Sequence, residues 1–227
     1  MIKRQIPNLI TLCNLACGVL SVLAALSYSF PRQAALLICL GILFDFFDGL
    51  TARLLGVSSP MGKELDSLAD VVTSGVAPAA ILYRLTEQTF INYGTQWLAV
   101  FFLLIPLFAA YRLAKFNLDT RQSHSFLGLP VPSQALVWVG VALTYERPSA
   151  IAVLVVSLLL NVLMVSELPL FSLKFNFKDL SWKTNSVQYI FLIVCAVIIA
   201  LLRDWIAISA IILWYIVFSM FTQKKHA

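Results

Sequence analysis

Residues 45–70 read Asp45-Phe-Phe-Asp48-Gly49-Leu-Thr-Ala52-Arg53, then eight residues, then Gly62-Lys-Glu-Leu-Asp66-Ser-Leu-Ala-Asp70. The flanking residues 33–44 and 71–82 are almost wholly apolar. This pattern predicts the ends of two membrane-buried helices that are joined by a short polar turn. Four carboxylates would gather at that turn.

Helical spacing brings these carboxylates together. On an α-helix Asp45 and Asp48 share a face, and Asp66 and Asp70 share a face of the next helix. An ionised Asp inside a bilayer costs about 2.5–3.5 kcal/mol, so four would cost on the order of 10 kcal/mol without compensating cations. Oxygen donors without His or Cys suit Mg²⁺ or Mn²⁺, with Ca²⁺ as an alternative occupant. We predict that the four aspartates hold a pair of divalent cations.

Small residues beside the carboxylates indicate a binding slot. Gly49 and Ala52 lie on the same face as Asp45 and Asp48, which leaves room for a flat or phosphorylated ligand. Two other interpretations remain open. The acidic helix ends could simply reach the membrane interface, or the carboxylates could form the ion site of a cation channel, transporter or proton relay.

The acidic stretch also carries a family resemblance. The pattern D-x2-D-G-x2-A-R-x8-G-x3-D-x3-D is matched at every fixed position, by Asp45, Asp48, Gly49, Ala52, Arg53, Gly62, Asp66 and Asp70. It resembles the signature of the CDP-alcohol phosphotransferases, membrane enzymes that displace CMP from a CDP-linked lipid or alcohol.

The resemblance implies a role for each position. Asp70 would accept the proton of the acceptor hydroxyl as catalytic base, next to metals held by the aspartates. Gly49, Ala52 and Gly62 would lie against the CDP group. Arg53 would either balance the acidic cluster or touch a phosphate.

A polar stripe near the N-terminus contains Pro7, Asn8, Thr11 and Asn14. Such a stripe in a membrane helix often forms hydrogen bonds to neighbouring helices. The run Pro-Asn-x-x-Thr also resembles the family segment that contacts the CDP group. We therefore expect Asn8 and Thr11 to bind the substrate.

Composition indicates one integral membrane domain over residues 1–227. The chain is 60% apolar and 12% charged, with a mean hydropathy of +0.90, which is typical of a polytopic membrane protein. We predict an all-α bundle of about eight transmembrane helices, since about 20 apolar residues cross a bilayer. The expected spans are 8–29, 33–55, 64–85, 95–116, 130–145, 149–166, 187–202 and 204–222.

Cation placement predicts the orientation. An even number of spans puts both termini on one side, and that side receives twelve of the Lys and Arg residues. These are Lys3, Arg4, Arg53, Lys63, Arg112, Lys115, Arg121, Lys174, Lys178, Lys183, Lys224 and Lys225. The other side receives Arg32, Arg84, Arg147 and Arg203. The positive-inside rule makes the first side cytoplasmic, so we expect an inner-membrane protein whose site faces the cytoplasm.

Two further segments, at about 73–78 and 112–132, bear on the acceptor. Ser74-Gly75-x-Ala77-Pro78 and the run from Arg112 to Lys115 with the later Gly-Leu-Pro-x-Pro resemble the phosphatidylserine synthase branch. The resemblance implies phosphate or serine binding by Ser74, Arg112 and Lys115. Close packing of small residues and ordinary cytoplasmic cations are the alternatives.

Two details of these segments modify the expectation. Lys115 stands where Arg is the form associated with the branch, and a point charge there replaces a bidentate fork. Gly75 and Pro78 are expected to kink the helix or to free a backbone carbonyl.

The combined prediction is transfer of the phosphatidyl group of CDP-diacylglycerol to L-serine, with phosphatidylserine and CMP as products. The signature leaves glycerol 3-phosphate or inositol phosphate open as acceptors. No nucleic-acid-binding motif is found in the sequence. The family resemblance implies a homodimer.

Overall fold

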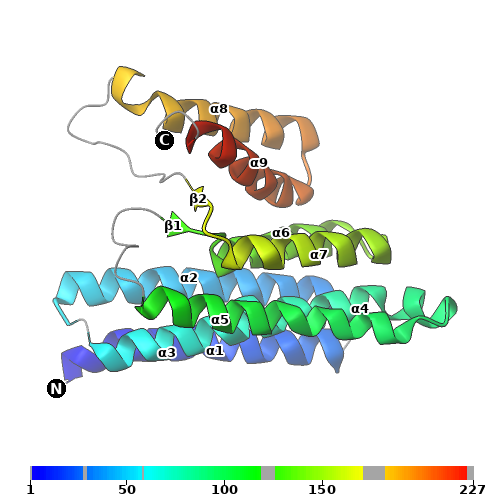
Figure 1. Ribbon diagram of the computed structural model, residues 1–227. Helices are drawn as coiled ribbons and strands as arrows, with labels where there is room; N and C mark the ends of the chain where they lie inside the picture. The colour runs from blue at the N-terminus through cyan, green and yellow to red at the C-terminus, as the bar shows by residue number, and fades with distance from the viewer. Residues whose placement is uncertain (1, 28–29, 58, 119–125, 171–181, 224–227) are drawn as a thin grey trace.

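The computed structural model describes residues 2–223, apart from 28–29, 58, 119–125 and 171–181. Nearly all of this part of the chain is helical (Figure 1). The first half contains α1 (Ile2–Leu26), α2 (Pro31–Leu55), α3 (Pro60–Asp70), η1 (Val71–Val76), α4 (Ala77–Asn92), η2 (Gln96–Leu103) and α5 (Leu104–Leu118). The second half contains β1 (Phe126–Leu127), α6 (Val131–Thr144), α7 (Ala150–Val165), β2 (Pro169–Leu170), α8 (Trp182–Leu202) and α9 (Ile206–Gln223).

Helix length and composition confirm a membrane-spanning bundle. Within the described residues, five helical segments are long and apolar enough to cross a membrane: Gln5–Leu26, Pro31–Leu55, Pro60–Asn92, Gln96–Leu118 and Asn185–Leu202. Three shorter apolar helices are Val131–Thr144, Ala150–Val165 and Ile206–Thr222. Each of the eight predicted spans therefore corresponds to a helical segment, and the all-α prediction is confirmed.

The third segment is longer and less regular than predicted. It runs from Pro60 to Asn92 instead of 64–85, and its middle turn, η1, is π-helical. Pro78 has no N–H to donate to the carbonyl of Ser74, so regular α-helical bonding is interrupted at this turn. The distortion agrees with the expected effect of Gly75 and Pro78, and it lies directly after Asp70.

The first helix also differs from its predicted bounds. It begins at Ile2 instead of near residue 8, so that Pro7 lies inside it. Pro7 is the sixth residue of the helix and lies beyond its first turn, so it removes one intrahelical bond, to the carbonyl of Lys3. This earlier start places Asn8 and Thr11 within a regular helix.

Close contact between α1 and η1 depends on Gly18. A Cβ atom added to Gly18 would lie 2.8 Å from the Cα of Thr73, which is closer than real side chains approach. The Thr73 hydroxyl donates a 2.9 Å hydrogen bond to the backbone carbonyl of Asn14. Small residues of this kind allow membrane helices to pack backbone to backbone.

The second half of the chain packs on one side of the first. In Figure 1, α6 and α7 lie next to the group α1 to α5, and α9 lies between α6 and α8. The two short strands pair antiparallel, with Phe126 opposite Leu170. The core between these layers contains fully buried Phe102, Trp138 and Met164.

Candidate active site

The turn between α2 and α3 brings the two acidic faces together. Gly56 ends α2 in a left-handed conformation, with φ of 62°, and its N–H caps the carbonyls of Ala52 and Arg53. Ser59 is the N-cap residue of α3, and its side chain accepts a hydrogen bond from the N–H of Gly62. Gly and Ser are the favoured residues at these two cap positions. The sequence thus encodes a tight reversal at the predicted place.

Three carboxylates converge next to this reversal. Asp45 and Asp48 on α2 and Asp66 on α3 each offer an oxygen, and these oxygens lie within 4.8 Å of one another. Asp48 is buried, whereas Asp45 and Asp66 are partly buried. The predicted convergence of two acidic helix faces is therefore present in the structure.

Asp70 lies one turn beyond Asp66, and the group of three does not include it. Its side chain is buried, and Oδ1 accepts a 3.3 Å hydrogen bond from Nδ2 of Asn14. A role for Asp70 as metal ligand or base stays a prediction.

The polar partners of the carboxylates are few. The Thr11 hydroxyl donates a hydrogen bond to Oδ2 of Asp48. Oδ1 of Asp66 is buried and has no hydrogen-bond partner within the described chain. Among the same residues, no Lys or Arg nitrogen lies within 4.0 Å of any of the four carboxylates. An all-oxygen cluster with an unpartnered buried oxygen fits a hard divalent cation.

A cavity of about 270 Å³ opens beside the cluster. All six residues that were predicted to bind the CDP group line it: Asn8, Thr11, Gly49, Ala52, Arg53 and Gly62. Asp48 and Asp66 form part of its wall. The structure thus gathers these predicted residues around one space that touches the acidic cluster.

Gly49 keeps this cavity open. A Cβ atom added there would meet only Nη2 of Arg53, at 3.7 Å, so the protein itself leaves the space in front of Gly49 empty. Arg53 is exposed, and its Nε donates to the carbonyl of Gly49 at 2.9 Å. This bond holds the start of the Arg53 guanidinium against α2, beside the cavity.

The three residues predicted to bind phosphate or serine lie in different settings. Arg112 is buried, its guanidinium lies 5.3 Å from the ring centre of Phe116, and its charge acts on Asp70. Ser74 is fully buried, and its hydroxyl has no partner among the described residues. Lys115 instead forms a 3.3 Å ion pair with Glu167, beyond the end of α7. Arg112 therefore lies near Asp70, while Lys115 is engaged with Glu167.

The sequence interpretation did not assign several residues of this site. Asn14, which donates a hydrogen bond to Asp70, lies on the polar stripe of the first helix. That position is the sequence feature that could have identified it as a site residue. Pro7, Val57, Ser59 and Lys63 also line the cavity. Lys63 lies inside the acidic signature, but a cation at a helix end also has an ordinary explanation in membrane topology.

The family model described as CDP-alcohol phosphatidyltransferase matches residues 4–171. The chain belongs to the CDP-alcohol phosphatidyltransferase family. The match includes every predicted site residue and ends before α8 and α9. The match therefore covers the helices that build the acidic cluster and the cavity.

Individual relatives within the CDP-alcohol phosphatidyltransferase family carry a more specific name. A CDP-diacylglycerol–serine O-phosphatidyltransferase of Bacillus subtilis (strain 168) is 36% identical over 165 residues, covering 73% of this chain and 89% of the relative. One of the same name from Helicobacter pylori (strain ATCC 700392 / 26695) is 33% identical over 224 residues, covering 94% and 89%. An archaetidylserine synthase of Methanothermobacter thermautotrophicus (strain ATCC 29096 and synonyms) is 34% identical over 168 residues, covering 72% and 68%.

Proposed function

We propose that the protein transfers the phosphatidyl group of CDP-diacylglycerol to the hydroxyl of L-serine, giving phosphatidylserine and CMP. The observation that carries this proposal is the cavity lined by the CDP-binding candidates directly beside the cluster of Asp45, Asp48 and Asp66. The names of the Bacillus and Helicobacter relatives support serine as the acceptor.

The donor nucleotide would occupy the cavity beside α2. Gly49 and Ala52 would let the cytidine approach the helix backbone, and Asn8 and Gly62 line the same cavity. Arg53 lies at the edge of the same cavity, where its charge would balance the donor phosphates.

Asp45, Asp48 and Asp66 would hold Mg²⁺ or Mn²⁺, with Asp70 as a further ligand or neighbour, and Ca²⁺ as an alternative occupant. A bound divalent cation would neutralise charge on the donor pyrophosphate and on departing CMP. The hydrogen bond from Thr11 orients Asp48 within this cluster.

The chemical step is a direct displacement. The serine oxygen attacks the phosphorus that bears diacylglycerol, a new P–O bond forms, and the bond from that phosphorus to the CMP oxygen breaks. Asp70 accepts the serine proton, and Asn14 fixes the orientation of its carboxylate. No covalent enzyme intermediate is needed, because acceptor and donor meet in one site.

The acceptor would be bound between η1 and α5. Arg112 carries a buried positive charge near Asp70 that suits the serine carboxylate or a phosphate. Ser74 offers a buried hydroxyl in the adjacent π-helical turn. Lys115 would join this group only if its ion pair with Glu167 opened.

We further propose that the protein lies in the inner membrane as a homodimer, with both termini and the acidic site facing the cytoplasm. The cation distribution supports this orientation. CDP-linked substrates would then be available on the side where the cavity opens.

The test is an assay of detergent-purified protein with CDP-diacylglycerol and Mg²⁺ or Mn²⁺. Serine, glycerol 3-phosphate and inositol phosphate are offered separately, and CMP and the lipid product are both measured. Phosphatidylserine with serine alone supports the proposal. CMP release with another acceptor would support phosphatidyl transfer and assign that acceptor in place of serine. Ion flux in liposomes without CMP release would favour a cation pathway.

A further inference from the structure

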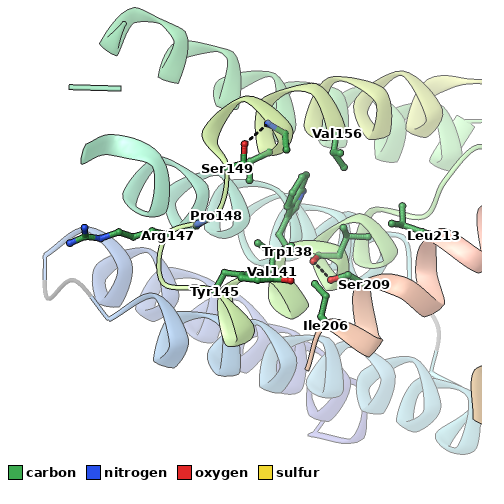
Figure 2. A pocket seen from close by; sticks show the side chains of 13 residues that line it. Trp138, Val141, Tyr145, Arg147, Pro148, Ser149, Val156, Ile206, Ser209 and Leu213 are labelled. Carbon is green, nitrogen blue, oxygen red and sulfur yellow. Dashed lines mark hydrogen bonds between the residues drawn. The ribbon is translucent and has the colours of Figure 1, made fainter. Parts of the chain in front are cut away.

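A second, larger cavity lies at the other end of the bundle. It has a volume of about 390 Å³, is open on one side, and is lined by residues of α6, α7, α9 and the α6–α7 connection (Figure 2). Its wall is almost entirely apolar, with Trp138, Val153, Val156 and Leu213 among the lining residues. The proposed transfer reaction does not use this space.

Two polar contacts between residues of the helix connections show at which end of the bundle the larger cavity opens. Arg32 at the start of α2 forms a 3.5 Å ion pair with Glu146, which follows α6. Thr144 donates a 3.1 Å hydrogen bond to Asp204 in the α8–α9 connection. Asp45 lies roughly 20 Å along α2 from Arg32. The cavity mouth and the acidic cluster are therefore at opposite ends of the bundle.

The mouth of this cavity carries positive charge. Arg147 lines it, and its side chain extends away from the apolar wall (Figure 2). Among the described residues, no carboxylate oxygen lies within 4.0 Å of its guanidinium. The neighbouring Ser149 caps the first turn of α7, which contains no acidic residue. A helix N-terminus and an unpaired guanidinium together favour an anion at this mouth.

The wall also contains one unpaired polar group. Trp138 is only 1% exposed, and its indole N–H has no hydrogen-bond partner within the described chain. Buried donors normally have an acceptor. The nitrogen has almost no accessible surface, so this donor faces the protein interior and is not part of the cavity's binding surface.

We propose that this cavity binds one acyl chain of a membrane phospholipid, with the lipid phosphate at Arg147 and the first turn of α7. In a phospholipid the apolar acyl chains lie below a negatively charged phosphate, and this cavity has an apolar wall below the cationic side chain of Arg147. Long Arg side chains near helix ends extend to the headgroup layer of a membrane. The proposal does not depend on the acceptor of the transfer reaction.

The test is native mass spectrometry of the purified full chain, delipidated in detergent and titrated with dioleoylphosphatidylglycerol. The wild type should bind one lipid saturably. Val156→Phe and Ala152→Phe each place an aromatic ring in the cavity and should each weaken binding about tenfold or more, because the ring occupies the space of the acyl chain. Arg147→Gln should weaken it about three- to tenfold through the lost phosphate contact.

Two matched variants control this experiment. Ile151→Phe adds a ring to the outer face of α7, where residue 151 is 72% exposed, and Arg203→Gln removes an exposed cation at the same end of the bundle. Both should bind lipid as the wild type does, and thermal unfolding checks that all variants are folded. Unchanged lipid binding by folded Ala152→Phe would overturn the proposal. A lipid-free dimer that is lost in the same variant would replace the lipid with a second copy of the chain.

Discussion

Asn14 on α1 donates a 3.3 Å hydrogen bond from Nδ2 to Oδ1 of Asp70 on α3. Both side chains are buried, and the backbone carbonyl of Asn14 accepts a second bond from the hydroxyl of Thr73. The first helix therefore holds the last aspartate of the signature at a fixed orientation. In the proposed reaction, this leaves Oδ2 as the oxygen that accepts the serine proton.

Asn14→Ala should lower kcat about 10- to 100-fold, because a misoriented catalytic group loses its alignment with the substrate. The KM for CDP-diacylglycerol should change little, since residue 14 does not line the donor cavity. Steady-state kinetics of CMP release measure both. Ser21→Ala is the matched control, because it removes another buried hydrogen bond of α1, to the carbonyl of Ala34. A raised KM with unchanged kcat would place Asn14 at the donor instead.

Asp70→Asn should abolish turnover while CDP-diacylglycerol binding remains largely intact. The amide keeps the shape of the side chain but cannot accept the serine proton at the substituted oxygen. Binding is measured by titration with the donor lipid, and turnover by CMP release. Loss of donor binding together with activity would show that Asp70 acts in the metal shell alone.

The acidic site was predictable because its information is local. Spacings of three and four residues put Asp45 with Asp48 and Asp66 with Asp70 on single helix faces, whatever the rest of the fold. The caps at Gly56 and Ser59 are also local, and they turn one face towards the other. The same reasoning found the apolar spans, because span length is fixed by the thickness of a bilayer.

Contacts between distant segments were not predictable in this way. The ion pair of Lys115 with Glu167 joins residues on α5 and beyond α7, and no periodicity encodes it. The bond from Asn14 to Asp70 depends on how α1 packs against α3. Residue type predicted a polar group at each place, but only the packing of the helices selects its partner.

Gly49→Leu should block donor binding by filling the 270 Å³ cavity. The added side chain meets open space in the protein, so folding should be unaffected while the cytidine position is lost. Binding of CDP, measured by calorimetry, should fall below detection. Ala16→Leu, at an exposed position of α1 that does not line the cavity, is the control. Normal CDP binding by folded Gly49→Leu would place the nucleotide elsewhere.

Arg112→Ala should raise the KM for serine more than the KM for CDP-diacylglycerol. Loss of a charge-assisted bond to a carboxylate costs about 1.5–3 kcal/mol, or roughly 10- to 150-fold in affinity. Arg84→Ala is the control, because Arg84 pairs with Glu87 within α4. The comparison is made by varying each substrate at saturating levels of the other. An unchanged serine KM would remove Arg112 from the acceptor site.

Removal of divalent cations should abolish CMP release, and added Mg²⁺ or Mn²⁺ should restore it. The three carboxylates lie close together without a neighbouring Lys or Arg among the described residues, so they repel one another unless a cation or protons intervene. Chelation followed by metal titration measures the effect. Asp66→Asn should raise the metal concentration needed for half-maximal activity, whereas Glu64→Gln, an exposed position on the same helix, should not. Full activity of the wild type after chelation, with no metal detected by elemental analysis, would contradict the metal site. The aspartates would then act only as proton acceptors or donors.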